Sequence, residues 1–200
     1  MDILNPEVGA VLQCDVGIDA VVDEDVASGA LVTSGIFAGL SPVLSPVSDI
    51  EAELTDQGAQ LHAIAAATGL AFRVVGFAVG IDGYYTTQPG KATPVDKTAT
   101  SLGNQVFPTI GNPPEPVDRY EYASAYGRSF LCRLDVLEAL DPIGEWGLFV
   151  EVLTDPLGDW VAAGGAVGDI VLYAVSHQPV NCKTQHHVYV NRFVITITGS

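Results

Sequence analysis

The side chains best suited to chemistry lie close together near the C-terminus. Cys182 is followed by His186 and His187, and His177 precedes it on the same segment. Thiolate and imidazole both bind zinc, so these residues are the candidate metal ligands. A closed zinc site needs four ligands that meet in space, and the chain has no Cys-x-x-Cys pair to help supply them. A second candidate is an iron site at a trimer axis, where symmetry would triple the number of histidine ligands. We interpret the segment as a polar loop between two strands and expect no cofactor.

No pattern in the sequence is typical of an enzyme's nucleophile. Ser176 and His177 are adjacent near the end of a predicted strand, where neighbouring side chains point to opposite faces, so they should not meet. Carboxylates are plentiful, but neither Glu145 nor Asp155 is singled out as one of a glycosidase pair. The glycines between residues 76 and 83 close a strand without a following helix, unlike a phosphate-binding loop. We therefore expect that the chain is not an enzyme.

The composition is that of an acidic chain with few charges. Among 200 residues, 24 are Asp or Glu and eight are Lys or Arg, which gives a formal net charge of −16. Such a charge repels phosphate, so nucleic acid and anionic membranes are not expected partners. Only 16% of the residues are charged while 48% are hydrophobic, and much of the surface must therefore be neutral. This is typical of a subunit that buries area against neighbours, or of a monomer rich in small polar residues.

No targeting or membrane-spanning segment is expected. The chain does not begin with a basic segment followed by an apolar run, and no stretch reaches the ~18 apolar residues of a membrane span. Three scattered cysteines do not make a disulfide framework. Folding in a reducing cytoplasm is the simplest expectation.

Two regions are expected along the chain. Residues 1–47 contain short β-branched runs and end in two Ser-Pro pairs, which is typical of an extended arm or a small β region. Residues 48–200 form the main domain. Within it, residues 84–116 are proline-rich and predicted to be loop, with one strand at 106–107, and such a long loop usually serves a function or packs on a partner. The residues expected at an interface are Phe107, Pro113 and Pro114 from this loop, with Tyr84, Tyr85 and Tyr120, because tyrosine is enriched at binding surfaces.

One helix followed by one strand is predicted after residue 47. Ser48 and Glu51 have the spacing of a capping box, and apolar residues on one face continue the helix to Gly69. A glycine within this stretch weakens the helix, so Thr55 is the alternative N-cap of a shorter one. Apolar residues of strand type then run from 72 to 79 and end in a glycine-rich turn.

The second half is predicted to be almost entirely β. Strands are expected at residues 120–123, 129–136, 146–153, 160–162, 170–175 and 188–197. In the strand at residues 129–136, apolar and charged residues alternate, so one face should be buried and the other exposed to solvent. The apolar pattern of the last strand changes phase around Asn191, which predicts a β-bulge. The predicted fold class is α+β and β-rich, an antiparallel sandwich-like sheet with one helix packed on it and long loops.

Two stretches of the sequence resemble the phage tail-collar fibre family. The first is Leu54-Thr55-Asp56-Gln57-Gly58, continuing through Thr68-Gly69 into the strand that ends in Phe77-Ala78-Val79-Gly80. The second is Gly144-Glu145-Trp146-Gly147-Leu148-Phe149, which is similar to a later strand of that family. The resemblance covers about residues 50 to 197. The long proline-rich loops between these stretches depart from the family pattern, and residues 1–47 have no counterpart in it.

The resemblance implies a structural protein of the virion tail, without catalytic residues. Such a protein anchors or joins a tail fibre or spike to the baseplate or collar through contacts with other tail proteins. It folds in the host cytoplasm and forms a homo-oligomer, with a trimer as the expectation for fibres. Residues 1–47 and 84–116 would then become ordered only in the complex.

Two other functions stay open. The first alternative is a carbohydrate-binding β module for host receptor recognition, in which Tyr84, Tyr85, Trp146 or Trp160 form an exposed stacking platform. The second is an enzyme or metalloprotein, which requires Cys182 and the nearby histidines to be ligands.

Overall fold

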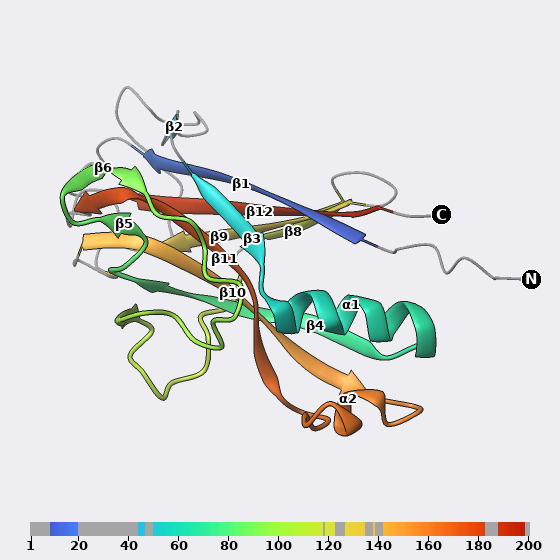
Figure 1. Ribbon diagram of the computed structural model, residues 1–200. Coiled ribbons are helices and arrows are strands. Elements are labelled where there is room, and N and C mark those ends of the chain that lie inside the picture. The colour runs from blue at the N-terminus through green and yellow to red at the C-terminus, as the bar shows by residue number, and fades with distance from the viewer. Residues whose placement is uncertain are drawn as a thin grey trace, which may run out of the picture.

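The chain folds into two antiparallel sheets that face each other, with one longer helix beside them (Figure 1). The computed structural model describes residues 9–19, 44–46, 50–117, 119–122, 127–134, 138, 142–182 and 188–198. Strands make up most of the regular structure in these ranges. The predicted fold class, α+β and β-rich with an antiparallel sandwich-like arrangement, is confirmed.

Each of the two main sheets has five strands. Sheet A has the order β2 (Leu44–Pro46), β1 (Gly9–Asp19), β12 (Val188–Thr198), β9 (Gly127–Leu134) and β8 (Arg119–Tyr122). Sheet B has the order β3 (Glu51–Leu54), β11 (Ile170–Cys182), β10 (Pro142–Thr154), β4 (Ala71–Gly80) and β7 (Gln105–Phe107). β1 pairs with β12 over its whole length, so a strand from the expected N-terminal region lies inside sheet A. The division of the chain at residue 47 stays a prediction.

The main apolar core fills the space between the two sheets. The indole ring of Trp146, on β10, lies with its centroid 5.6 Å from the ring of Tyr189 on β12 and 5.7 Å from that of Phe77 on β4. The described inward side chains of β9 are Phe130, Cys132 and Leu134, as the alternating pattern predicted. Removing a large apolar side chain from water contributes about 1.5–3 kcal/mol, so these contacts hold the sheets together.

Helix α1 (Asp56–Thr68) begins later than the capping-box pattern predicted. The residues after Ser48 that were expected to start it form β3, which pairs with β11. The prediction of a start at Ser48 was therefore wrong, because pairing with a sheet outweighed a local capping signal. The alternative N-cap is confirmed: Oγ1 of Thr55 accepts a hydrogen bond from the backbone N of Gly58 at 3.0 Å.

The first turn of α1 rests directly on sheet B. A side chain at Gly58 would collide with the carbonyl oxygen of Tyr173 on β11, so the glycine that weakens the helix also permits this close approach. Leu61 is fully buried in the core, and the helix ends at the predicted Gly69, whose φ of 73° is left-handed. Within the described ranges, no helix is both long and apolar enough to cross a membrane.

Residues 160–162 belong to a helix and not to the predicted strand. They form most of α2 (Asp159–Ala162), a single turn in the connection between β10 and β11. An apolar run this short does not distinguish a strand from a helical turn, because it spans too few residues to show a period. Trp160 points inward from this turn and is 3% exposed.

The predicted bulge in β12 is absent. β12 pairs with β1 and with β9 in unbroken register through Asn191. Asn191 itself points into the core, where its amide donates to Oγ of Ser176 at 2.8 Å. A polar side chain at a core position therefore produced the apparent change of phase.

Part of the outer face of sheet B is covered by the chain itself. Leu102, from the proline-rich loop, packs with Leu172 and Val175 of β11 in a second apolar cluster on this face. The loop begins with an additional hairpin of β5 (Tyr84–Tyr85) and β6 (Gln88–Ala92), where the sequence predicted no strand. The expectation that residues 84–116 become ordered only in a complex stays a prediction.

Candidate functional site

The predicted metal ligands do not form a described site. Cys182 is the last residue of β11, and His186 and His187 lie outside the described residues. His177 lies on β11 and contacts other groups. Across the described ranges, no three His, Cys, Asp or Glu side chains come together in a way that could hold a metal ion.

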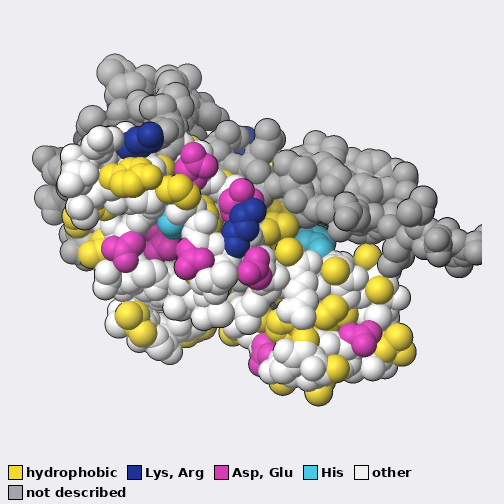
Figure 2. Space-filling model, viewed as in Figure 1, with side chains coloured by type: hydrophobic (Ala, Val, Ile, Leu, Met, Phe, Trp, Pro, Cys, Tyr) yellow, Lys and Arg dark blue, Asp and Glu magenta, His cyan; other side chains and the backbone are white. Residues whose placement is uncertain are grey.

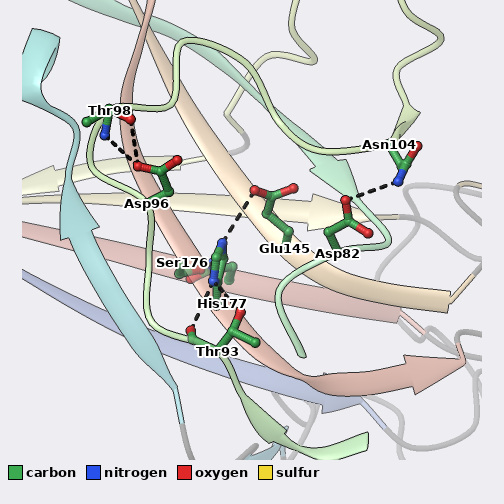
Figure 3. Close-up of polar contacts among 9 residues, drawn as sticks. Asp82, Thr93, Asp96, Thr98, Asn104, Glu145, Ser176 and His177 are labelled. Atoms are coloured by element: carbon green, nitrogen blue, oxygen red, sulfur yellow. Dashed lines mark hydrogen bonds and ion pairs between the residues drawn. The ribbon is translucent and has the colours of Figure 1, made fainter. Parts of the chain in front are cut away.

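His177 is the centre of a buried polar cluster on the outer face of sheet B (Figure 3). Its Nε2 lies 3.4 Å from Oε1 of Glu145 on β10, and both side chains are almost fully buried. Its Nδ1 lies 3.0 Å from both the carbonyl oxygen and Oγ1 of Thr93, which follows β6. The polar cluster of Thr93, Glu145 and His177 thus joins two strands of sheet B to the loop that covers them.

Ser176 and His177 have separate partners, as their adjacency on a strand predicted. The hydroxyl of Ser176 faces sheet A and accepts from Asn191, whereas His177 faces the covering loop. Figure 3 shows the two side chains on opposite sides of β11. They do not form a nucleophile and base pair.

The polar cluster has the residue types of a catalytic triad but not the hydrogen bonding of one. A triad base must accept the proton of the hydroxyl group through an unprotonated nitrogen. Here the carbonyl oxygen of Thr93, which can only accept, lies as close to Nδ1 of His177 as the hydroxyl does. An Nδ1 that donates to this carbonyl cannot serve as the base for Oγ1. The geometry therefore fits a clamp that fastens the loop to sheet B.

A notch opens beside the covered part of the same sheet face. It encloses a cavity of about 440 Å³. Its floor includes Ala78 of β4 and Phe149 of β10, one wall is the loop at residues 111–114, and Ile170 lines the other side. Two of the predicted interface residues, Pro113 and Pro114, belong to the loop wall. We call this cavity the notch.

Exposed apolar side chains gather on the connection between β10 and β11, whose Ile170 lines the notch. We call residues 153–170, which join β10 to β11 and include α2, the hairpin arm. Of the seven large apolar side chains that are exposed among the described residues, five are on the hairpin arm and one, Ile110, adjoins the loop wall. Those on the arm are Leu153, Leu157, Val161, Val167 and Ile170. Figure 2 shows hydrophobic side chains over the lower right lobe, which is the hairpin arm, and a recess between this lobe and the loop.

The hairpin arm is held in shape by its own hydrogen bonds. Nε1 of Trp160 donates to Oδ2 of Asp169 at 3.3 Å, and the same oxygen accepts from the backbone N of Ala166 at 2.6 Å. Oδ2 of Asp155 accepts from the backbone N of Val161 at 3.0 Å. The buried indole and two carboxylates therefore fix a turn that presents apolar residues outward.

The other predicted interface residues are scattered. Phe107 packs against the main core, Tyr84 is half-buried, and Tyr85 is exposed at the β5–β6 hairpin. Tyr120 is on β8, and its side chain lies outside the described part. The exposed residues of the hairpin arm were missed because they follow no period. Their only signal was the presence of large apolar residues in a glycine-rich connection.

No protein-family model, no curated protein and no solved structure matches the chain.

Proposed function

We propose that this chain is a non-catalytic assembly protein that binds another protein at the notch. The observation that supports this best is the concentration of exposed apolar side chains on the hairpin arm and beside the facing loop. Exposing a contiguous apolar surface to water is unfavourable, and such surfaces are typical of protein interaction sites. The fixed shape of the arm lowers the entropic cost of binding, because little has to be ordered on association.

The resemblance to the tail-collar fibre family supplies the biological setting of the proposal. In that setting the chain is a structural protein of a phage virion that anchors or joins a tail fibre or spike to the baseplate or collar. The bound protein is another tail protein, and the chain itself assembles as a homo-oligomer, with a trimer expected from the resemblance.

The charge of the hairpin arm indicates the kind of surface that the partner presents. Residues 153–170 contain three aspartates and neither Lys nor Arg. A partner that covers the notch therefore needs an apolar centre with Lys or Arg at its rim. Its association rate should fall as salt concentration rises, because the rim charges are screened.

The carbohydrate-binding alternative has less support. Trp146 and Trp160, two of the four aromatic residues expected on its stacking platform, are buried, and Tyr84 is half-buried. Tyr85 alone among these four presents an exposed ring, at 40% exposure. A glycan array probed with the wild-type chain and with Tyr85→Ala tests it, and binding that is lost in the variant would favour this alternative over the assembly role.

The test of the assembly role is a double substitution on the hairpin arm. Leu157→Asp with Val161→Asp places two carboxylates on the exposed apolar surface without touching the buried side chains. Binding to purified baseplate and fibre proteins, measured by co-purification and light scattering, should weaken about tenfold or more. Thr86→Asp, an exposed position on the β5–β6 hairpin, is the matched control and should bind normally.

Two results would overturn the proposal. One is unchanged binding by the double variant with its fold intact by circular dichroism. The other is absence of the chain from purified virions when their proteins are identified by mass spectrometry.

A further inference from the structure

A second cavity lies between the two sheets, beside α1, and it shares no lining residue with the notch. It has a volume of about 400 Å³, within the range of roughly 300–1,000 Å³ typical of small-molecule sites. We call it the α1 cavity. Its apolar lining comes from Val117, from Phe72 and Val74 of β4, and from Phe130 and Ile195 of sheet A.

The two sheets pack closely at one end of β4 and less closely at the other. Phe77 and Val79 point between the sheets and are fully buried. Phe72 and Val74 also pack against the main core but are only partly buried. Protein interiors are normally close-packed, so side chains that are partly buried on an inward face leave contacts unmade. An apolar molecule in this space would make those contacts and would leave water.

One wall of the α1 cavity is built of three rings. The rings of His62 and Phe72 meet edge to face with centroids 5.4 Å apart, and Tyr173 lies 5.8 Å from Phe72 and 5.5 Å from His62. Nε2 of His62 and the hydroxyl of Tyr173 form a hydrogen bond with each other. Burial lowers the pKa of His62 and raises that of Tyr173, so both side chains are neutral near pH 7. The wall is therefore aromatic and uncharged.

The two arginines at the α1 cavity interact with the protein itself. Arg73 lies between Phe72 and Val74 on β4, so its guanidinium is on the outer face of sheet B. There Nη2 and Nε of Arg73 both donate to Oε2 of Glu151, at 2.7 and 2.9 Å. Arg128 also has an interaction within the chain. The described lining residues include no Asp or Glu. A charged ligand would therefore lose its hydration without gaining a charge partner, so the cavity favours a neutral one.

We propose that the α1 cavity binds a neutral, apolar aromatic molecule between Phe72 and Val74 of β4 and Phe130 and Ile195 of the facing sheet. An apolar cavity of about 150 Å³ is large enough to bind benzene, so the larger α1 cavity has room for two or more rings. Rings are favoured over aliphatic chains because they can meet the aromatic wall edge to face or in offset stacks. This site does not depend on protein binding at the notch.

The proposal is tested by titrating the intact chain with N-phenyl-1-naphthylamine, a neutral aromatic probe whose fluorescence rises in apolar surroundings. The matched charged probe is 1-anilinonaphthalene-8-sulfonate, which adds only a sulfonate to the same rings. The neutral probe should bind saturably, with one molecule per chain, and should shift the methyl NMR signals of Val74 and Ile195. The sulfonate should bind beside these methyl groups about tenfold more weakly or worse, because its charge would be buried without a partner.

A pair of substitutions tests the location. Val74→Trp fills the cavity from β4 and should abolish binding of the neutral probe. Val161→Trp makes the same change at an exposed position on the hairpin arm and should bind the probe like the wild type.

Three results would overturn the inference. The first is no saturable binding of the neutral probe to the wild-type chain, and the second is equally tight binding of the sulfonate at this site. The third is retained binding by Val74→Trp with its fold intact by circular dichroism. If Val74→Trp does not fold, the wild-type NMR signals decide: shifts at Val74 and Ile195 support the site, and binding that leaves both signals in place overturns it.

Discussion

The two halves of the outer face of sheet B differ in how far their apolar side chains are exposed. On β11, Leu172 and Ile170 are two residues apart and therefore point to the same face. Leu172 is 1% exposed beneath the covering loop, whereas Ile170 is 52% exposed beside the notch. The residue types are equivalent, so the difference lies in what covers them. One half of the face is closed by this chain, and the other half is left open.

A loop lies beside the open half of the face but does not cover it. The loop at residues 111–117 runs beside the notch, and it is held at the edge of β4 by two backbone hydrogen bonds between Phe77 and Glu115, at 2.7 and 2.8 Å. A side chain at Gly76 would collide with the carbonyl oxygen of Glu115, so glycine there permits this attachment. The loop therefore stands as a wall and not as a lid, which leaves room for a partner over the apolar floor.

The largest expected effect concerns the contact between His177 and Glu145, which helps to fasten the loop over the covered half. His177→Leu removes the partner of the Glu145 carboxylate and leaves it buried and unpaired. Breaking a buried pair from one side costs about 3–5 kcal/mol, so the free energy of unfolding should fall by about that amount. Denaturant titration followed by circular dichroism measures it.

The matched control for this change replaces both partners. Glu145→Leu with His177→Leu removes the unpaired charge, and replacing both members of a buried pair by apolar groups is often close to neutral. The double variant should therefore be more stable than His177→Leu alone. Equal stability of the single and double variants would contradict the clamp role, because it would mean that the loss of His177 does not leave a costly unpaired carboxylate at Glu145.

The next largest effect is the loss of stability when an apolar side chain is shortened in each half of the face. Leu172→Ala should lower the free energy of unfolding by about 2–4 kcal/mol, because it leaves a cavity beneath Leu102. Ile170→Ala should cost less than about 1 kcal/mol in the isolated chain, because its side chain is already half in water. Denaturant titrations of both variants measure the difference. If Ile170→Ala is as destabilising as Leu172→Ala, the notch is closed in solution and the comparison fails.

The periodic elements were predictable from sequence because each carries its own local signal. The strand at β4, the alternation in β9 and the glycine cap at Gly69 follow from side-chain pattern and backbone preference. The start of α1 was less certain because β3 forms only by pairing with β11, more than a hundred residues away. A local capping signal contains no information about such a partner.

The candidate sites were less predictable, because they depend on contacts between distant segments. Sequence reasoning singled out His177 only as a candidate metal ligand, and its partners are Thr93 and Glu145, which only the fold brings to it. It did place Pro113 and Pro114 at an interface, and both line the notch, while that role itself stays a prediction. The notch is lined by residues of four strands and by the loop at residues 111–114, which are far apart in the sequence, so no local pattern could bring them together.

The smallest effect concerns a turn in the covering loop. The pKa of Asp96 is held below its usual range by hydrogen bonds to its carboxylate from the hydroxyl and the backbone N of Thr98, 2.7 and 3.0 Å long. Thr98→Ala removes the hydroxyl donor, so the pKa of Asp96 should rise toward 3.8, its ordinary value. A ¹³C NMR titration of the Asp96 carboxyl group measures this shift, and Thr100→Ala in the same loop should leave it unchanged.

The sign of the pH dependence follows from the direction of this shift. A carboxyl group whose pKa is depressed in the folded chain favours the fold at neutral pH, and this contribution is lost as the pH falls through the folded pKa. Amide hydrogen exchange of residues 93–104 should therefore quicken at acidic pH relative to the rest of sheet B, once corrected for the intrinsic exchange rate. In Thr98→Ala this acid sensitivity should begin at higher pH. If the pKa of Asp96 does not move in Thr98→Ala, the turn is not formed in solution, and the cover over Leu172 depends on the clamp at His177 and on apolar packing alone.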